Sequence, residues 1–222
     1  MFFLILFAMI GVMNKRNYRQ EMDNLIASFD SAPTLLLHSC CAPCSSACLE
    51  MLVPYFKITV LYYNPNITDS EEYRKRVSEE KRFIDSINSD WAGLMPVYNK
   101  VEFIDGRYNP DEFWQIAKGY ENCPEGGERC FRCYELRLRE AANMALQGQY
   151  DYFTTTLTIS PLKNAEKLNE IGESVASEFG VKFLPSDFKK KDGYKRSIEL
   201  SREYNLYRQN YCGCVYSQPT RA

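Results

Sequence analysis

The sequence lacks several features that would place a chain in a broad class at once. It has no apolar run long enough to cross a membrane, because the apolar stretch at residues 1–12 falls well short of the ~20 residues that a spanning helix needs. A secretory signal is also disfavoured, since the positive charges of Lys15, Arg16 and Arg19 follow this stretch instead of preceding it. We therefore expect a cytoplasmic protein without membrane attachment, and we interpret residues 1–12 as a start-site artefact or a loosely tethered tail.

An excess of charge is missing as well. With 27 basic and 29 acidic side chains the net charge is -2, which gives no overall electrostatic reason to expect nucleic-acid binding. Any such binding must come from a local basic surface. Internal repeats, Gly/Ser-rich linkers and low-complexity runs are absent too, so we expect one α/β catalytic domain over residues 30–222, preceded by an N-terminal tail over residues 1–29.

Strand-like and helix-like segments alternate from about residue 30 onward, which predicts a mostly parallel sheet flanked by helices, with a nucleotide-hydrolase-like (Rossmann-like) core. The apolar run Thr34–His38 is typical of a strand that is buried on both faces. Further strands are expected at residues 57–63, 96–103, 151–156 and 181–184. Helices are expected from Ser45 or Ser46 to Phe56, from Thr68 or Asp69 to Asn88, from Arg132 to Leu146, and from Ser160-Pro161 to Gly180.

Cysteine, by contrast, is abundant. There are nine, and six of them fall into three tight groups: Cys40-Cys41, Cys130-x-x-Cys133 and Cys212-x-Cys214. Disulfide frameworks belong to small secreted domains, whereas a chain of 222 residues with 45% hydrophobic residues can build an ordinary core. The count is odd, and adjacent cysteines seldom bridge each other because the bond is strained. The groups therefore favour metal binding or dithiol redox chemistry.

The positions of the first two groups point to a site. Ligands of doubly wound sheets bind beyond the carboxyl ends of the strands, and Cys40, Cys41 and Cys44 directly follow the first predicted strand. Cys130 and Cys133 lie near the N-terminus of the predicted helix that ends at Leu146, and a helix N-terminus would stabilise thiolates. A four-thiolate zinc site usually pairs two regular C-x-x-C motifs, while an iron–sulfur cluster accepts ligands from separate loops. The irregular spacing favours the cluster, with zinc as the alternative.

Two further features bear on the chemistry. Cys212 and Cys214 are separated by one glycine and can form only a small, strained disulfide, which is the easily reduced kind. We interpret them as a redox-active couple, and a pair of extra metal ligands is the alternative. His38, the only histidine, immediately precedes the first cysteines. It is a candidate proton donor or ligand, although a strand-end histidine is at least as commonly hydrogen-bonded to the backbone.

Several separated blocks carry a resemblance to one known family. They are His38-Ser-Cys-Cys-Ala-Pro-Cys44, Tyr63-Asn-Pro-Asn66, Arg129-Cys-Phe-Arg-Cys-Tyr134, Thr154-Thr-Thr-Leu157, Ser160-Pro161, Asp187–Tyr194, Ser197–Ser201 and Leu206–Ser217. Through these blocks, residues 33 to 217 resemble the QueH family of epoxyqueuosine reductases. The resemblance implies a cytoplasmic oxidoreductase that converts epoxyqueuosine to queuosine at the wobble position of tRNA, without cobalamin and with an electron donor that the sequence does not identify.

The resemblance also implies roles for the cysteines. The ligands of a 4Fe-4S cluster map onto Cys40, Cys41, Cys130 and Cys133, and a redox-active disulfide maps onto Cys212 and Cys214. Deoxygenating an epoxide needs two electrons while a cluster transfers one at a time, so a nearby dithiol can supply or store the pair. We add Cys44 as a candidate ligand of an auxiliary metal, an additional iron ion, although a small buried cysteine would look the same in the sequence.

A tRNA substrate needs phosphate contacts, and the best candidate is a basic segment close to Cys212 in which tyrosines are interleaved. Its members are Lys189, Lys190, Lys191, Tyr194, Lys195, Arg196, Arg202, Tyr204, Tyr207 and Arg208. An ordinary solvated surface is the alternative interpretation.

Two other functions stay open. One is an iron–sulfur or zinc-containing enzyme of the tRNA-thiolation type, and the other is a zinc-stabilised RNA-binding module. The first loop counts against a nucleotide-binding enzyme, because Cys-Cys-Ala-Pro-Cys stands where glycine amides would bind pyrophosphate. The binding module leaves Cys212 and Cys214 without a purpose.

Overall fold

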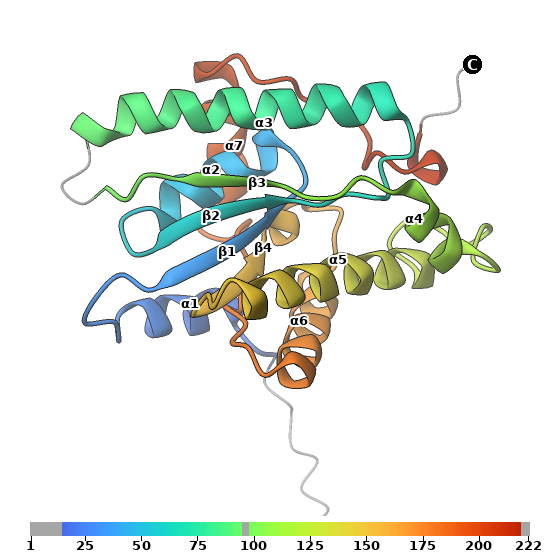
Figure 1. Cartoon of the computed structure of the whole chain (residues 1–222), viewed down its shortest axis with the longest axis horizontal. Coiled ribbons are helices and arrows are strands. Elements are labelled where there is room, and N and C mark those ends of the chain that lie inside the picture. Colours follow the sequence, from blue (N-terminus) through green and yellow to red (C-terminus); the bar gives the residue numbers. More distant parts are fainter. Residues whose placement is uncertain (1–14, 95–97, 219–222) are drawn as a thin grey trace, which may run out of the picture.

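The computed structural model describes residues 15–94 and 98–218. Its sheet is parallel throughout, with the strand order β3-β2-β1-β4 and helices on both faces (Figure 1). The strands are β1 (Thr34–Ser39), β2 (Lys57–Tyr62), β3 (Glu102–Asp105) and β4 (Tyr152–Thr155). Strands β2 and β3 follow one another on one side of β1, and the chain then crosses to the other side of β1 to form β4. Rossmann-like sheets have the same crossover, so the predicted fold class is confirmed.

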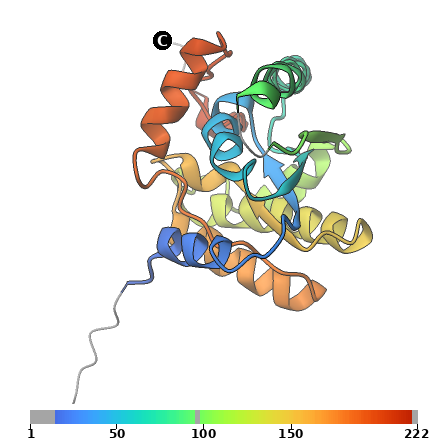
Figure 2. The same cartoon turned by 90° about the vertical axis from the view of Figure 1, so that its left-hand side faces the viewer.

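The helices form two layers that enclose the sheet (Figure 2). One layer contains α2 (Ala42–Leu52), α3 (Ser70–Asp90) and α7 (Gly193–Glu203), and the other contains α5 (Glu128–Gln147) and α6 (Ala165–Phe179). Helix α1 (Tyr18–Ile26) precedes the sheet, and α4 (Pro110–Ala117) packs against α5. Three short 3-10 helices complete the described chain: η1 (Trp91–Gly93), η2 (Thr156–Ile159) and η3 (Val215–Ser217).

The apolar strands separate two cores. Leu35 and Leu37 of β1 point to one face and join the core beneath α2, α3 and α7, while Leu36 points to the other face and joins the core beneath α5 and α6. All three leucines are fully buried. This explains why β1 is a continuous apolar run instead of an alternating one.

Helix α1 lies in the segment that we assigned to the N-terminal tail. Asn17 caps it by accepting a hydrogen bond from the Gln20 N–H at 3.2 Å. Met22 is fully buried in the same core as Leu35, and such burial stabilises the fold by roughly 1.5–3 kcal/mol. Part of the tail therefore packs on the domain. Residues 1–12, the expected artefact, lie outside the described residues.

Several predicted helix boundaries were wrong. Helix α2 begins at Ala42, three residues before Ser45, because Pro43 suits the first turn of a helix. Helix α5 begins at Glu128 with Gly127 as its N-cap, so Cys130 and Cys133 lie inside it. Helix α6 begins at Ala165, where the side chain of Asn164 accepts from the Lys167 N–H at 3.0 Å, and not at Ser160-Pro161.

Other predicted ends were confirmed. Asp69 caps α3 by accepting from the N–H groups of Glu71 and Glu72 at 2.8 and 3.0 Å, and Gly180 ends α6 in the left-handed conformation. The strand expected at residues 181–184 is only an isolated bridge between Phe183 and Phe153. Helices α1, α4 and α7 were not predicted.

Strand β3 is shorter than the predicted strand at residues 96–103. Part of that prediction falls on residues 95–97, outside the described residues, and the strand itself begins at Glu102. The reason is a side chain: the Asn88 amide donates to the Val101 carbonyl at 2.9 Å and accepts from the Val101 N–H at 2.8 Å. Both backbone groups of Val101 are thereby removed from sheet pairing.

Candidate metal and thiol site

The first cysteine group lies where β1 ends and α2 begins. Cys40 follows the last residue of β1, Cys41 is the N-cap of α2, and Cys44 lies in its first turn. The three sulfur atoms lie within 4.8 Å of one another, and the Sγ atoms of Cys40 and Cys41 are 3.8 Å apart. Three thiols gathered in this way could hold a metal ion.

The three thiols of this group differ in the direction of their pKa shifts. Hydrogen bonds with Cys41 and Cys44 hold the pKa of the Cys40 thiol well below its ordinary value, and the cations of Arg137 and Lys163 act in the same direction. Cys41 and Cys44 keep their own protons, because hydrogen bonding to Cys40 raises the pKa of both thiols. A group with one thiolate prepared in advance suits a soft metal ion.

The second group, Cys130 and Cys133, lies in the first two turns of α5 on one face of the helix. The Cys130 sulfur accepts a hydrogen bond from the Gly126 N–H at 3.3 Å. Burial raises the pKa of Cys133 to about 12 and also raises that of Cys130. The expected stabilisation of thiolate by the helix end is thus outweighed by desolvation, and a bound metal would be needed to ionise this pair at neutral pH.

The third group is held by a glycine and an arginine. Gly213 has φ 107°, a conformation that favours glycine, and a Cβ atom there would meet Ile67 Cγ1 at 2.8 Å. Arg76 of α3 is buried and donates from Nη1 to the Cys212 backbone oxygen at 3.1 Å. Cys214 is buried in the same apolar cluster as Cys133, and both Cys212 and Cys214 are free thiols.

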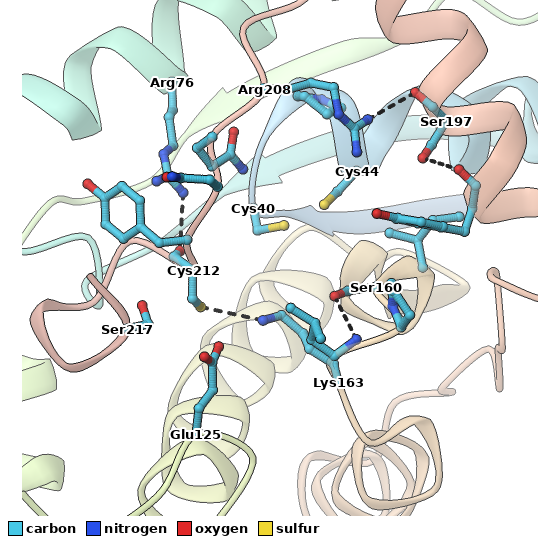
Figure 3. Close-up of a pocket in the computed structure, with 18 residues that line it drawn as sticks. Cys40, Cys44, Arg76, Glu125, Ser160, Lys163, Ser197, Arg208, Cys212 and Ser217 are labelled. Carbon is cyan, nitrogen blue, oxygen red and sulfur yellow. Dashed lines mark hydrogen bonds between the residues drawn. The ribbon is translucent and has the colours of Figure 1, made fainter. Parts of the chain in front are cut away.

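The three groups meet around two adjoining cavities. The larger has a volume of about 260 Å³ and is lined by Cys40, Cys44 and Cys212 (Figure 3). The smaller is lined by Cys130 and Cys133 together with Cys212 and Cys214. Cys212 therefore lies on the wall that the two cavities share.

The four predicted cluster ligands are distributed over both cavities. Cys40 lines the larger cavity, with Cys41 buried next to it, while Cys130 and Cys133 line the smaller one. A donor set of thiols from two separate segments is compatible with an iron–sulfur cluster, whose irons accept ligands from different directions. Cys44, the candidate for an auxiliary metal, belongs to the same tight group as Cys40 and Cys41.

Three cations beside the thiols were missed in the sequence. Lys163 donates from Nζ to the Cys212 sulfur at 3.4 Å and lines both cavities. Arg137 is 1% exposed and donates to the Asn64 side-chain oxygen at 2.6 Å, while its Nη1 atom has no hydrogen-bond partner in the described part of the chain. Arg76 is the third. Arg137 follows Cys133 by four residues and so shares its helix face, which was a usable signal. Nothing in the local pattern of residues pointed to the other two.

His38 is a structural residue. It is fully buried, its Nδ1 atom is hydrogen-bonded to the Thr155 hydroxyl at 2.8 Å, and its Nε2 atom lies 3.0 Å from the Tyr63 carbonyl oxygen and 3.3 Å from the Arg137 Nε atom. Burial and the Arg137 cation lower its pKa to about 3, so the ring is neutral. This arrangement matches the backbone-bonded alternative and does not supply a proton donor.

The predicted basic segment divides into two kinds of residue. Tyr194 and Arg208 line the larger cavity, and Lys190 and Lys195 are exposed. The remaining lysines and Arg196 already have acidic partners: Lys189 with Asp187, Lys191 with Asp23, and Arg196 with Glu50, each at 2.7 Å. Arg202 is exposed, whereas Tyr204 and Tyr207 form hydrogen bonds with Trp91 and Glu72.

Within the described ranges, no helix is both long and apolar enough to cross a bilayer.

Cysteine groups and cations at the carboxyl edge of a parallel sheet define an α/β protein whose gathered thiols could hold a metal ion. Residues 35–220 match the family model described as epoxyqueuosine reductase QueH. A relative of that name from Staphylococcus epidermidis is 42% identical over 208 residues, which cover 91% of this chain and 85% of the relative. The relative from Staphylococcus aureus is 40% identical over 208 residues, covering 91% of this chain and 84% of the relative. The one from Thermotoga maritima is 34% identical over 190 residues, covering 83% of this chain and 90% of the relative.

The chain therefore belongs to the QueH family of epoxyqueuosine reductases, a family of oxidoreductases. The match covers all of the described sheet except Thr34, the first residue of β1, and it covers all three cysteine groups. It favours the reductase over the thiolation-type enzyme and the RNA-binding module.

Proposed function

We propose that this protein reduces epoxyqueuosine to queuosine at the wobble position of tRNA, in the cytoplasm. The observation that carries the proposal is the meeting of the three cysteine groups around Cys212, in a chain that belongs to a family of epoxyqueuosine reductases. The larger cavity, at about 260 Å³, is close in size to the clefts that bind small molecules and can admit the small epoxide-bearing ring.

We further propose that Cys40, Cys41, Cys130 and Cys133 hold a 4Fe-4S cluster. When bound, such a cluster supplies one-electron transfer and a Lewis-acidic iron for the epoxide oxygen. The chain's own contribution is to prepare the ligands: Cys40 is held toward its thiolate form, and the Gly126 N–H orients the Cys130 sulfur. Cys44 is the candidate ligand for an additional iron ion beside Cys40 and Cys41.

Cys212 and Cys214 form the proposed redox-active pair. A dithiol that closes to a disulfide releases two electrons and two protons, which is what the removal of one epoxide oxygen as water requires. The strain of a disulfide across one residue makes it easy to reduce again. Arg76 and Gly213 keep this pair at the wall between the cavities, and an external electron donor would restore the dithiol after each turnover.

The proposed tRNA contact is centred on the mouth of the larger cavity. Tyr194 and Arg208 line it, and Lys190 and Lys195 are exposed on the same stretch of chain, available to phosphates. The other three basic residues of the segment can bind phosphates only if their carboxylate partners are displaced, so we assign them a smaller part of the tRNA affinity. They are Lys189, Lys191 and Arg196.

One preparation tests the proposal. Protein purified without oxygen should show a broad visible absorption band that dithionite bleaches, and it should convert tRNA bearing epoxyqueuosine to tRNA bearing queuosine. The same tRNA already carrying queuosine is the control and should be unchanged. A colourless zinc protein that leaves epoxyqueuosine intact would refute the proposal.

A further inference from the structure

Lys163 has a position that the proposed function leaves unused. It lies in the turn between η2 and α6, where its N–H donates to the Ser160 carbonyl at 3.2 Å and the Leu162 N–H donates to the Ser160 hydroxyl at 3.3 Å. This turn places the side chain along the wall of both cavities. Figure 3 shows it reaching toward Cys212, where Nζ lies 3.4 Å from the sulfur.

The cation therefore lies where a substrate oxygen would arrive. Lys163 lines the larger cavity with Cys40 and Cys44 and also the smaller cavity with Cys130 and Cys133. A group bound in the larger cavity would contact the Lys163 ammonium and the Cys212 sulfur together. The charged side chains that line these cavities with Lys163 are Arg76, Glu125, Arg129, Arg137 and Arg208, and Tyr134, Tyr194, Tyr211 and Cys214 are the other titratable ones.

We propose that Lys163 is the proton donor to the epoxide oxygen, and that between turnovers its ammonium holds Cys212 as a thiolate. This inference rests on the proposed function. Because an alkoxide is a poor leaving group, protonation of the oxygen as the C–O bond breaks is the step that a positioned acid can accelerate.

The step balances with groups on this chain. The Cys212 thiolate and the Cys214 thiol lose two electrons and form an S–S bond, and both C–O bonds of the epoxide break to leave a carbon–carbon double bond. The oxygen takes the two electrons, one proton from the Lys163 ammonium and one from the Cys214 thiol, and leaves as water. Lys163 ends as a neutral amine, which regains a proton when an external thiol or other reductant restores the dithiol.

Proton and electron release are coupled by the surroundings of Lys163. Burial lowers the pKa of its ammonium, and the negative charges that Cys212, Tyr134 and Cys40 can carry, with Cys212 first among them, raise the pKa above its ordinary value. When Cys212 becomes part of a neutral disulfide, the largest of these charges disappears while the burial stays. The ammonium is then a stronger acid when the oxygen needs the proton.

Two substitutions separate the two parts of this role. Lys163→Met removes the charge, while Lys163→Arg keeps the charge on a group that does not give up its proton. Lys167→Met is the matched control, because Lys167 lies on α6 and pairs with Glu170 at 3.1 Å on the surface. Unchanged circular dichroism and melting temperature would show that each variant folds.

The first measurement is alkylation of Cys212 by iodoacetamide across pH, followed by peptide mass spectrometry on the reduced protein. We expect the midpoint to rise by about one pH unit or more in Lys163→Met and to stay at the wild-type value in Lys163→Arg and Lys167→Met. An unchanged midpoint in Lys163→Met would overturn the thiolate pairing.

The second measurement is the single-turnover rate of deoxygenation by prereduced protein on tRNA bearing epoxyqueuosine. We expect both Lys163 variants to lose about 100-fold or more, and Lys167→Met to keep the wild-type rate. A wild-type rate in Lys163→Arg would overturn proton donation alone. A wild-type protein that does not deoxygenate the substrate would overturn the proposed function and the proton step together, while the alkylation result would stand by itself.

Discussion

Arg76 of α3 donates a hydrogen bond to the backbone oxygen of Cys212 at 3.1 Å, although 136 residues separate the two in the chain. The arginine is itself fixed by Glu72 at 2.7 Å and is 2% exposed. A rigid helix thus sets the position of the Cys-Gly-Cys segment, and disturbing that segment should affect catalysis before it affects folding.

Gly213→Ala tests this relationship. The added Cβ would meet Ile67 and the Arg76 guanidinium at 2.8 and 3.1 Å, in a backbone conformation that alanine adopts at a cost of about 1–3 kcal/mol. We expect a modest loss in the free energy of unfolding, measured in urea, and a large loss of multiple turnover. Gly93→Ala is the control, because a Cβ there meets nothing within 4 Å. Wild-type turnover in Gly213→Ala would contradict the expected rigidity.

Replacing any one of Cys40, Cys41, Cys130 or Cys133 by Ala should lower bound iron and abolish epoxide reduction, because an iron–sulfur cluster with three ligands is weakly held and open to oxygen. Iron per chain and deoxygenation would be measured together in anaerobic preparations. Cys123→Ser, in the loop before α5, should keep wild-type values for both. Iron content at the wild-type level in all four alanine variants would refute the ligand assignment.

Cys212→Ser distinguishes a redox couple from extra ligands. If Cys212 is half of a redox couple, the Cys212→Ser substitution should leave the iron–sulfur spectrum unchanged. Multiple turnover should stop, because the two-electron reservoir is lost. If the pair instead binds metal, iron content should fall in parallel with activity. Full multiple turnover in the double variant Cys212→Ser, Cys214→Ser would exclude both roles.

Stability should depend on pH through Glu80. This residue is fully buried in α3, and burial raises its pKa from 4.5 to about 8. The folded state therefore keeps a proton that the unfolded state has lost, so the free energy of unfolding falls as the pH rises from 4.5 to about 8, by up to roughly 1.4 kcal/mol per pH unit.

Glu80→Gln cannot ionise and should lack this term. The difference in unfolding free energy between the variant and the wild type should move in favour of the variant between about pH 5 and about pH 8, as measured in urea. If that difference is the same at both pH values, the pKa of Glu80 is not raised in the folded state.

The N-terminal segment yields a prediction with a built-in comparison. Deleting residues 1–12 should leave the melting temperature and activity unchanged, because we interpret them as a start-site artefact or a loosely tethered tail. Met22→Ala, only ten residues further on, removes a fully buried side chain and should cost about 2–5 kcal/mol. A large drop in melting temperature on deletion would show that residues 1–12 contribute to folding.

The features that could be predicted from the sequence are those that depend on residues close together in the chain. The apolar run of β1 and the Asp69 cap were recognisable because each is decided within a few residues. The three cysteine groups were recognisable because spacing alone marks them. Helix α1 was missed because its polar sequence forms a helix only once Met22 has a core to enter.

The rest of the site depends on contacts that are distant in the chain. Lys163 becomes significant only when the fold brings it to Cys212, 49 residues away. The pKa of Cys133 depends on how completely α4 and the C-terminal segment cover it, so the helix position alone predicted the wrong direction. The pattern of neighbouring residues therefore predicts neither the contact between Lys163 and Cys212 nor the pKa of Cys133.

The late start of β3 also limits pairing between copies of this protein. An edge strand with free backbone groups is a template for another chain, and a long, flat apolar edge invites aggregation. Here the Asn88 side chain takes both backbone groups of Val101, and the four residues that remain begin and end with the exposed acids Glu102 and Asp105. This edge of the sheet is thus short and carries two acids, of which Asp105 pairs with Lys81 at 2.7 Å. Replacing Asn88 would free both backbone groups of Val101 and lengthen the exposed edge strand. The main expected effect is aggregation of the protein at high concentration.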